Sequence, residues 1–200
     1  MAFTQSKDFI RRRLEGVSSQ EEEAQIPADF FDEDPSPASV LIPFFRKNDA
    51  WHVLFIRRTE GINDMHGGQV AFPGGRADEA DASLEATALR EAWEEVGLDP
   101  KHVEILGRLN SYHTISNYLV TPIIGVIPWP YPFKLESNEV ARAFDIPLDW
   151  LSEPANHTTT TPEVSRIPFE HEVTYFKPYA GELLWGVTAK IVLNLVLALE

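Results

Sequence analysis

A group of glutamates gives this chain its clearest chemical feature. Successive residues of an α-helix turn by about 100°, so Glu91, Glu94 and Glu95 would share one helix face. Like charges at this spacing destabilise a helix by a few tenths of a kcal/mol per pair. A divalent cation would remove the repulsion, and Mg²⁺ or Mn²⁺ prefers carboxylate and phosphate oxygens. The cluster therefore indicates a metal site that could act on phosphates.

An acidic helix face is more often only a solvated surface, because glutamate is a good helix former. The residues around the cluster favour the metal site. The pair Gly74-Gly75 allows the backbone to approach a ligand closely and leaves a carbonyl available. Arg90 can hold a neighbouring carboxylate in a fixed orientation.

Three nearby elements are expected to position these residues. Residues 83–96 have helix-forming composition, and Gly97 is suited to the left-handed residue that ends a helix. Residues 39–45 and 51–57 have strand patterns, and the polar residues 46–49 between them predict a hairpin turn.

The rest of the chain mixes strands and helices. Such an order favours an α+β fold, with a mixed β-sheet covered by helices, over a regular parallel array. The expected elements are strands at 103–109, 119–127, 140–146 and 172–176, loops at 128–132 and 150–168, and a helix at 188–199 with one apolar face.

The length of 200 residues predicts one domain with additions. Residues 7–15 have helical character, whereas Glu21-Glu22-Glu23 and the Pro- and Asp-rich residues 27–37 are typical of a solvated connection. We therefore expect an N-terminal helix and acidic, Pro-rich connection over residues 1–35, followed by a compact domain over residues 36–200.

Charge and composition restrict the partners. The chain has 31 acidic and 17 basic residues, a net charge of −14, which repels nucleic acid and anionic membranes. A small anionic substrate could still bind beside a cation. There is no cysteine, no secretory signal and no membrane-length apolar run, so we expect a cytoplasmic protein that uses neither disulfides nor thiolates. Homodimer formation stays open.

The acidic cluster and its surroundings resemble the signature of the Nudix hydrolase family: Gly, five residues, Glu, seven residues, Arg-Glu, an aliphatic residue, any residue, Glu-Glu, any residue, Gly, an aliphatic residue. Asp81 stands at the first acidic position, and eight residues rather than seven separate it from Arg90. The matching residues are Gly75, Arg90, Glu91, Glu94, Glu95, Gly97 and Leu98.

Both departures, and further stretches of the chain, are similar to the coenzyme A pyrophosphatase branch of that family. These stretches are residues 54–58, 68–75, 87–92, 120–122, 138–140 and 185–189. The resemblance implies an α/β/α sandwich and Mg²⁺- or Mn²⁺-dependent hydrolysis of a nucleoside diphosphate linked to another moiety. Coenzyme A would give 3′,5′-ADP and 4′-phosphopantetheine. Alternatives are ADP-ribose, a dinucleotide or an oxidised nucleotide as substrate, or a non-catalytic Nudix-fold ligand sensor.

The resemblance also implies roles for residues of the signature. Glu91, Glu94 and Glu95 would bind the metal, and Gly75 would add its carbonyl oxygen. Arg90, counted with the catalytic residues, would brace the loop and helix together with Asp81.

Other residues are assigned from their chemistry. A carboxylate beside a metal could orient or deprotonate the attacking water, and Glu95 and Glu139 are the candidates; Glu139 could equally be a solvated loop residue. Bidentate contacts to substrate phosphates are expected of arginines near the Gly-rich segment, unless they are merely exposed or paired with carboxylates. These are Arg57, Arg58 and Arg76. Three aromatic residues could stack on adenine or fill the core: Tyr112, Tyr118 and Trp129. His66 and His113 have no metal-binding spacing and receive no role.

Overall fold

A mixed β-sheet forms the centre of the computed structural model, which describes residues 5–17, 26–27, 30–60, 67–162 and 171–200. Within these residues β1 (Ser36–Lys47) runs antiparallel to β2 (Ala50–Arg58) and parallel to β7 (Tyr118–Val126). The sheet is completed by β3 (Val70–Ala71), β4 (Gly74–Arg76), β5 (Glu104–Arg108), β6 (Tyr112–His113) and β8 (Val140–Pro147). The strand directions confirm the predicted mixed sheet.

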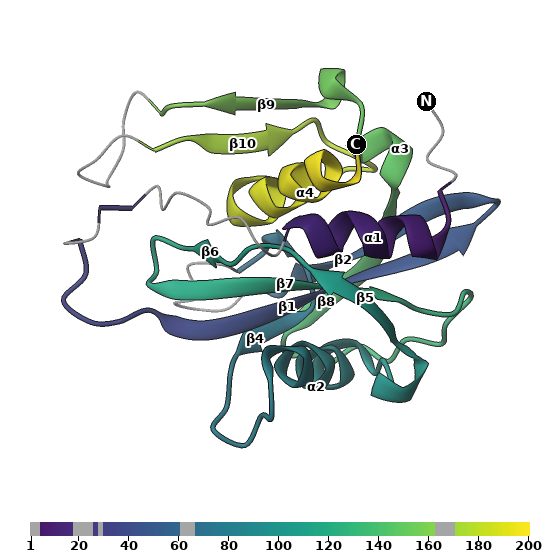
Figure 1. The fold of residues 1–200 in the computed structure, drawn as a ribbon, viewed down its shortest axis with the longest axis horizontal. Coiled ribbons are helices and arrows are strands. Elements are labelled where there is room, and N and C mark those ends of the chain that lie inside the picture. The colour runs from purple at the N-terminus through teal and green to yellow at the C-terminus, as the bar shows by residue number, and fades with distance from the viewer. Residues whose placement is uncertain (1–4, 18–25, 28–29, 61–66, 163–170) are drawn as a thin grey trace.

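Helices cover both faces of this sheet (Figure 1). On one face lies α2 (Leu84–Val96), and on the other lie α1 (Lys7–Val17) and α4 (Gly186–Leu199). The predicted α/β/α layers of an α+β fold are therefore confirmed. The remaining elements are the short helix α3 (Leu148–Leu151), the 3₁₀ turns η1 (Pro100–His102) and η2 (Pro154–Asn156), and an antiparallel pair beyond α4 formed by β9 (His157–Thr160) and β10 (Val173–Phe176).

Strand β1 is buried on both faces, which is why two helical layers are needed. Its side chains alternate between the two hydrophobic clusters. Leu41 and Phe45 belong to the cluster that contains Ala92 of α2, whereas Ile42 and Phe44 belong to the cluster on the face of α1 and α4. Each of these four β1 side chains is fully buried, and each contributes about 1.5–3 kcal/mol to folding. The sheet thus supplies a rigid floor for α2.

Local sequence signals set the ends of the elements around the site. Asn48 and Asp49 have φ angles of 51° and 63°, the left-handed pair that a two-residue hairpin requires. The side chain of Ser83 accepts a hydrogen bond from the N–H of Ala86, and Gly97 ends α2 with a φ of 69°. The predicted hairpin and the predicted helix ending at Gly97 are both confirmed.

One predicted loop contains a strand, whereas the N-terminal helix predicted at residues 7–15 is confirmed. The prediction of a loop over residues 150–168 is wrong for β9, whose threonines are exposed and therefore give no apolar alternation. Helix α1 packs on the sheet, with Ile10 and Leu14 at 0% and 1% exposure. The acidic residues 21–23 lie outside the described residues. Among those described, no helix combines the length and apolar character needed to cross a membrane.

Candidate active site

Two glycines bring the backbone of β4 against both β1 and α2. Gly74 pairs with Val40 and Gly75 with Ser39 in the antiparallel β1–β4 ladder. A Cβ atom on Gly74 would lie 2.5 Å from the carbonyl oxygen of Ser39 and 2.6 Å from Cα of Val40. A Cβ atom on Gly75 would lie 2.6 Å from the carboxyl carbon of Glu91. A side chain at Gly74 would collide with the backbone of β1, and a side chain at Gly75 would collide with the Glu91 carboxylate.

Alanine substitutions at the two glycines should therefore have different effects. Gly74→Ala forces β1 and β4 apart and should lower the free energy of unfolding by about 1–3 kcal/mol. Gly75→Ala displaces the Glu91 carboxylate and should lower kcat/KM more than tenfold at a smaller cost in stability. Urea denaturation and steady-state kinetics measure the two effects. Gly16→Ala, where a Cβ meets nothing within 4 Å, is the control, and equal effects of all three substitutions would contradict this account.

Glu95 is the most deeply buried carboxylate of α2. Its side chain is 2% exposed, and one carboxylate oxygen accepts a hydrogen bond of 3.0 Å from the N–H of Gly74. The guanidinium Nη1 of Arg58 is 3.9 Å from the other oxygen. Burial raises the pKa of Glu95 to about 8, although Gly74 and Arg58 lower it. These two contacts do not fully compensate the buried negative charge.

The three predicted glutamates share a helix face but differ in depth. The side chain of Glu91 is 16% exposed and that of Glu94 is 55% exposed. Burial raises the pKa of Glu91, Arg90 lowers it, and the charges of Glu94 and Glu139 raise it further. The carboxylates therefore repel one another, as the helical spacing predicts, although burial is the larger cause of the raised pKa at both Glu91 and Glu95.

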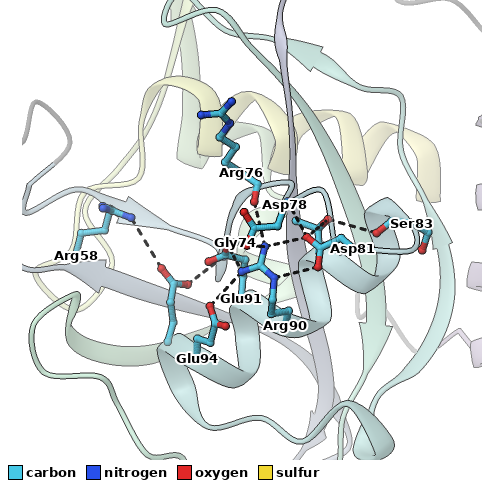
Figure 2. Close-up of polar contacts among 11 residues, drawn as sticks. Arg58, Gly74, Arg76, Asp78, Asp81, Ser83, Arg90, Glu91 and Glu94 are labelled. Carbon is cyan, nitrogen blue, oxygen red and sulfur yellow. Dashed lines mark hydrogen bonds and ion pairs between the residues drawn. The ribbon is translucent and has the colours of Figure 1, made fainter.

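Arg90 ties the Gly-rich strand, the following loop and α2 together (Figure 2). Its Nε and Nη2 donate to the two carboxylate oxygens of Asp81 at 3.0 and 2.9 Å. Its Nη1 donates to Glu91 at 2.8 Å and to Glu94 at 3.1 Å, and Nη2 also donates to the carbonyl of Arg76 at 3.1 Å. Arg90 therefore fixes the orientation of two glutamates from the candidate metal cluster.

Asp81 should make stability depend on pH in the acid range. Hydrogen bonds from Arg90 hold the pKa of Asp81 well below its ordinary value. Since the folded pKa is the lower one, the contribution is present above the unfolded pKa near 4 and is lost as the pH falls below it. The difference in unfolding free energy between the wild type and Asp81→Asn should therefore shrink from pH 5 to pH 2. Denaturant titrations at several pH values measure it, and a constant difference would contradict the assignment.

A loop from β7 to β8 brings Glu139 to the end of α2. The N–H groups of Lys134 and Glu136 donate to the carbonyls of Val96 and Glu95, at 2.9 Å each. The last carbonyls of a helix have no partner within the helix, so these bonds both end α2 and anchor the loop. The charge of Glu139 raises the pKa of Glu91 and of Glu95, which places it within electrostatic reach of both.

The sequence profile of the NUDIX domain family matches residues 35–178, which include the whole arrangement of Gly75, Asp81, Arg90 and the glutamates. This chain belongs to the Nudix family. The predicted family is thus confirmed.

Known Nudix proteins agree with this assignment. A relative named "Uncharacterized Nudix hydrolase NudL" from Yersinia pestis (strain Pestoides F) is 42% identical over 159 residues, covering 79% of this chain and 77% of the relative. A protein of the same name from Yersinia pseudotuberculosis (serotype O:1b, strain IP 31758) has the same identity and coverage. A crystal structure of a MutT/nudix family protein from Enterococcus faecalis has a TM-score of 0.53 at 18% identity, covering 97% of this chain and 73% of that one, and shows the shared fold. The chain is a Nudix hydrolase, of a family that acts on nucleoside diphosphate derivatives.

The two departures from the Nudix signature, Asp81 in place of glutamate and the extra residue before Arg90, lie in one loop and the start of α2. The N–H of Asp78 and the hydroxyl of Thr87 donate to Asp81, at 3.0 and 2.9 Å. The loop therefore turns back so that the shorter aspartate reaches Arg90. Ser83 caps α2 two residues after Asp81, so most of the eight residues between Asp81 and Arg90 are helical.

The three predicted phosphate-binding arginines lie in different surroundings. Arg58 is next to Glu95, as described above. Arg57 pairs with the buried Glu182 at 3.3 Å and with Glu60 at 3.6 Å. Figure 2 shows the side chain of Arg76 pointing away from Arg90, although its carbonyl accepts the bond from Arg90. Of these arginines, Arg58 has the direct contact with the glutamate cluster. Nothing in the sequence singled out Glu182, which also holds Arg142 at 3.1 Å.

The aromatic and histidine candidates lie in different surroundings. Trp129 stacks on Phe45 with ring centroids 4.1 Å apart and packs, half-buried, against the hydrophobic cluster on the face of α2. Tyr112 and Tyr118 instead line a pocket beside β3. The imidazole of His113 bonds Asn117 at 2.9 Å, and His66 lies outside the described residues.

The donor set of this Nudix site suits an oxygen-preferring cation. The predicted donors are the carboxylates of Glu91, Glu94 and Glu95 and the carbonyl of Gly75, and none of these is a nitrogen or sulfur donor. In the part of the chain that the structure describes, no three acidic or histidine side chains are grouped closely enough to hold a metal ion; Arg90 contacts Glu91, and the N–H of Gly74 contacts Glu95. Burial disfavours the ionised form of Glu95, and a cation bound beside this carboxylate would favour that form again.

Proposed function

We propose that this Nudix hydrolase is a coenzyme A diphosphatase that requires Mg²⁺ or Mn²⁺ and releases 3′,5′-ADP and 4′-phosphopantetheine. The observation that carries the proposal is Glu95, a buried carboxylate held by the N–H of Gly74 beside Glu91 and Glu139. The ionised form of this buried carboxylate is incompletely compensated by the protein, which supports a role in which a bound cation supplies the missing positive charge. The choice of coenzyme A is supported by the branch-like stretches of the sequence.

Glu91, Glu94 and Glu95, with the carbonyl of Gly75, would hold the metal. When bound, the ion neutralises phosphate charge and lowers the pKa of a coordinated water. Arg90 orients Glu91 and Glu94 through its two Nη1 contacts and is therefore a positioning residue. Arg58, next to Glu95, is placed to bind a phosphate oxygen.

Glu139 is the better candidate for the general base. Glu95 is buried and accepts a hydrogen bond from Gly74, which suits a fixed ligand. Glu139 is exposed on the β7–β8 loop, so a water molecule can reach it, and it lies within electrostatic reach of Glu91 and Glu95. An exposed carboxylate close to the metal ligands can take the proton of the attacking water.

The test is a product analysis with the purified chain. Coenzyme A, ADP-ribose, a diadenosine polyphosphate and an oxidised nucleoside triphosphate would each be incubated with Mg²⁺, and the products separated by chromatography. We expect 3′,5′-ADP from coenzyme A, the highest kcat/KM for this substrate, and no reaction in excess chelator. A higher kcat/KM for any of the other three substrates would overturn the coenzyme A assignment. Absence of hydrolysis of all four would favour a ligand sensor.

A further inference from the structure

Thr59, the residue after β2, bonds the loop that carries Glu139. Its N–H donates to the carbonyl of Glu139 at 2.9 Å, and its hydroxyl donates to the carbonyl of Asn138 at 2.6 Å. Its own carbonyl accepts the N–H of Gly68 at 3.2 Å, at the start of the segment that leads into Gly74-Gly75. Thr59 thus connects the Gly-rich segment with the loop of the candidate general base.

The two carbonyls that Thr59 contacts stand on either side of the Cα atom of Glu139. Because a peptide unit is planar, the backbone of one residue has only two soft dihedral angles. The bonds from Thr59 hold the peptide units before and after this Cα atom, and the N–H of Glu139 donates to the carbonyl of Glu136 at 3.0 Å. The direction of the Cα–Cβ bond of Glu139 is therefore set by the backbone, although Glu139 is exposed.

Glu136 holds the same loop from the side of α2. Its N–H donates to the carbonyl of Glu95 at 2.9 Å. Its carboxylate accepts the backbone N–H of Asn138 at 3.2 Å and the side-chain N–H of Asn138 at 2.8 Å. The loop is thus held between the end of α2 and the end of β2, and Thr59 supplies contacts on the β2 side.

The strand pairing beside Thr59 ends before it reaches Glu139. The last pair of the β2–β8 ladder is Arg58 with Val140, and the register shifts between Arg57 and Arg58. The position of Glu139 therefore depends on contacts outside the ladder. Since Arg58 also lies 3.9 Å from the carboxylate of Glu95, this end of β2 contacts both carboxylates considered as general base, one through a side chain and one through the backbone.

We propose that Thr59 is a positioning residue for the reaction, whose hydroxyl and N–H groups aim the carboxylate of Glu139 at the attacking water. The inference rests on the proposed function, in which Glu139 is the general base. A base must lie within hydrogen-bond reach of the proton that it takes, and a misplacement of about 1 Å can cost about a hundredfold in rate. The hydroxyl of Thr59 should therefore affect kcat and leave KM nearly unchanged.

The test compares Thr59→Val, which keeps the shape but lacks the hydroxyl, with Thr59→Ser, which keeps the hydroxyl. The kinetics use the best of the four substrates at saturating Mg²⁺. Thr59→Val should lower kcat about tenfold with KM changed less than about twofold, and Thr59→Ser should stay within about twofold of the wild type in both. Thr59→Ala also lacks the hydroxyl and should repeat the loss. Thr160→Val, at an exposed threonine of β9, is the matched control and should keep wild-type kinetics.

A double-variant cycle with Glu139→Gln separates positioning of the base from a general structural role. Glu139→Gln alone should lower kcat. Adding Thr59→Val to it should lower kcat by less than about a further twofold, because no base is left to aim.

Three outcomes would overturn the inference while the proposed function stands. These are wild-type kcat in Thr59→Val and Thr59→Ala, an equal loss in Thr59→Ser, and the same loss from Thr59→Val with and without Glu139→Gln. Failure of the coenzyme A assignment is seen separately, as no release of 3′,5′-ADP from coenzyme A while another substrate is hydrolysed. Wild-type kcat in Glu139→Gln, or hydrolysis of none of the four substrates, would overturn both the proposed reaction and the inference.

Discussion

Replacement of Glu95 by glutamine is expected to lower kcat/KM by about 10²- to 10³-fold while the fold is kept, the scale of losing one group that supports transition-state charge. Glutamine has nearly the same shape and can still accept the hydrogen bond from Gly74. It lacks the negative charge that would bind the cation. The loss should therefore appear in catalysis rather than in folding, and rates at saturating Mg²⁺ measure it.

The same substitution should remove a destabilising charge from the metal-free protein. Burial raises the pKa of Glu95 to about 8, above its unfolded value, so the native state binds more protons than the unfolded state. The free energy of unfolding of the metal-free wild type should therefore fall as the pH rises from about 4 to about 8. The Glu95→Gln protein should lack the part of this decrease that comes from the titration of Glu95.

Glu85→Gln, in the first turn of the same helix, is the control for both measurements and should keep wild-type kinetics. A Glu95→Gln protein with undiminished activity in Mg²⁺ would contradict the assigned role.

Replacement of Arg90 by lysine should have the second largest effect, although it conserves the charge. The guanidinium bonds both oxygens of Asp81 and also holds Glu91 and Glu94. A lysine ammonium cannot reproduce this fork geometry. We expect the free energy of unfolding to fall by roughly 2–4 kcal/mol and kcat/KM to fall more than tenfold, because the metal-binding carboxylates lose their orientation.

Urea denaturation of Arg90→Lys, Asp81→Asn and the double variant forms a thermodynamic cycle for this pair. The two substitutions should be strongly non-additive, since each removes the same bidentate contact. Arg12→Lys, at an exposed position of α1, is the control. Additive effects, or an Arg90→Lys protein with wild-type activity and stability, would contradict the bracing role.

The parts of the fold that the sequence predicts are those encoded by local signals. Asn48 and Asp49 adopt left-handed backbone angles readily, so the hairpin is visible in the sequence. Ser83 and Gly97 mark the two ends of α2 through their capping chemistry. The Nudix signature adds the relation between Gly75, Asp81 and Arg90. Strand β9 was missed because its exposed threonines show no apolar pattern.

Contacts between distant segments could not be predicted in this way. Glu139 comes near α2 because loop N–H groups bond the last carbonyls of the helix, and no local pattern records that pairing. Glu182 binds Arg57 across a sequence separation of 125 residues. Trp185 and Arg58 likewise line the same pocket beside β3 only because α4 packs over the sheet.

Binding of a divalent cation at the acidic face of α2 is the claim on which the proposed reaction depends, and a titration of metal-free protein with Mn²⁺ tests it most directly. Electron paramagnetic resonance of the free ion measures the bound fraction for the wild type and for a Glu91→Gln, Glu95→Gln double variant. We predict saturable binding by the wild type and at least tenfold weaker binding by the double variant. Equal binding by both proteins, or none by the wild type, would contradict the account.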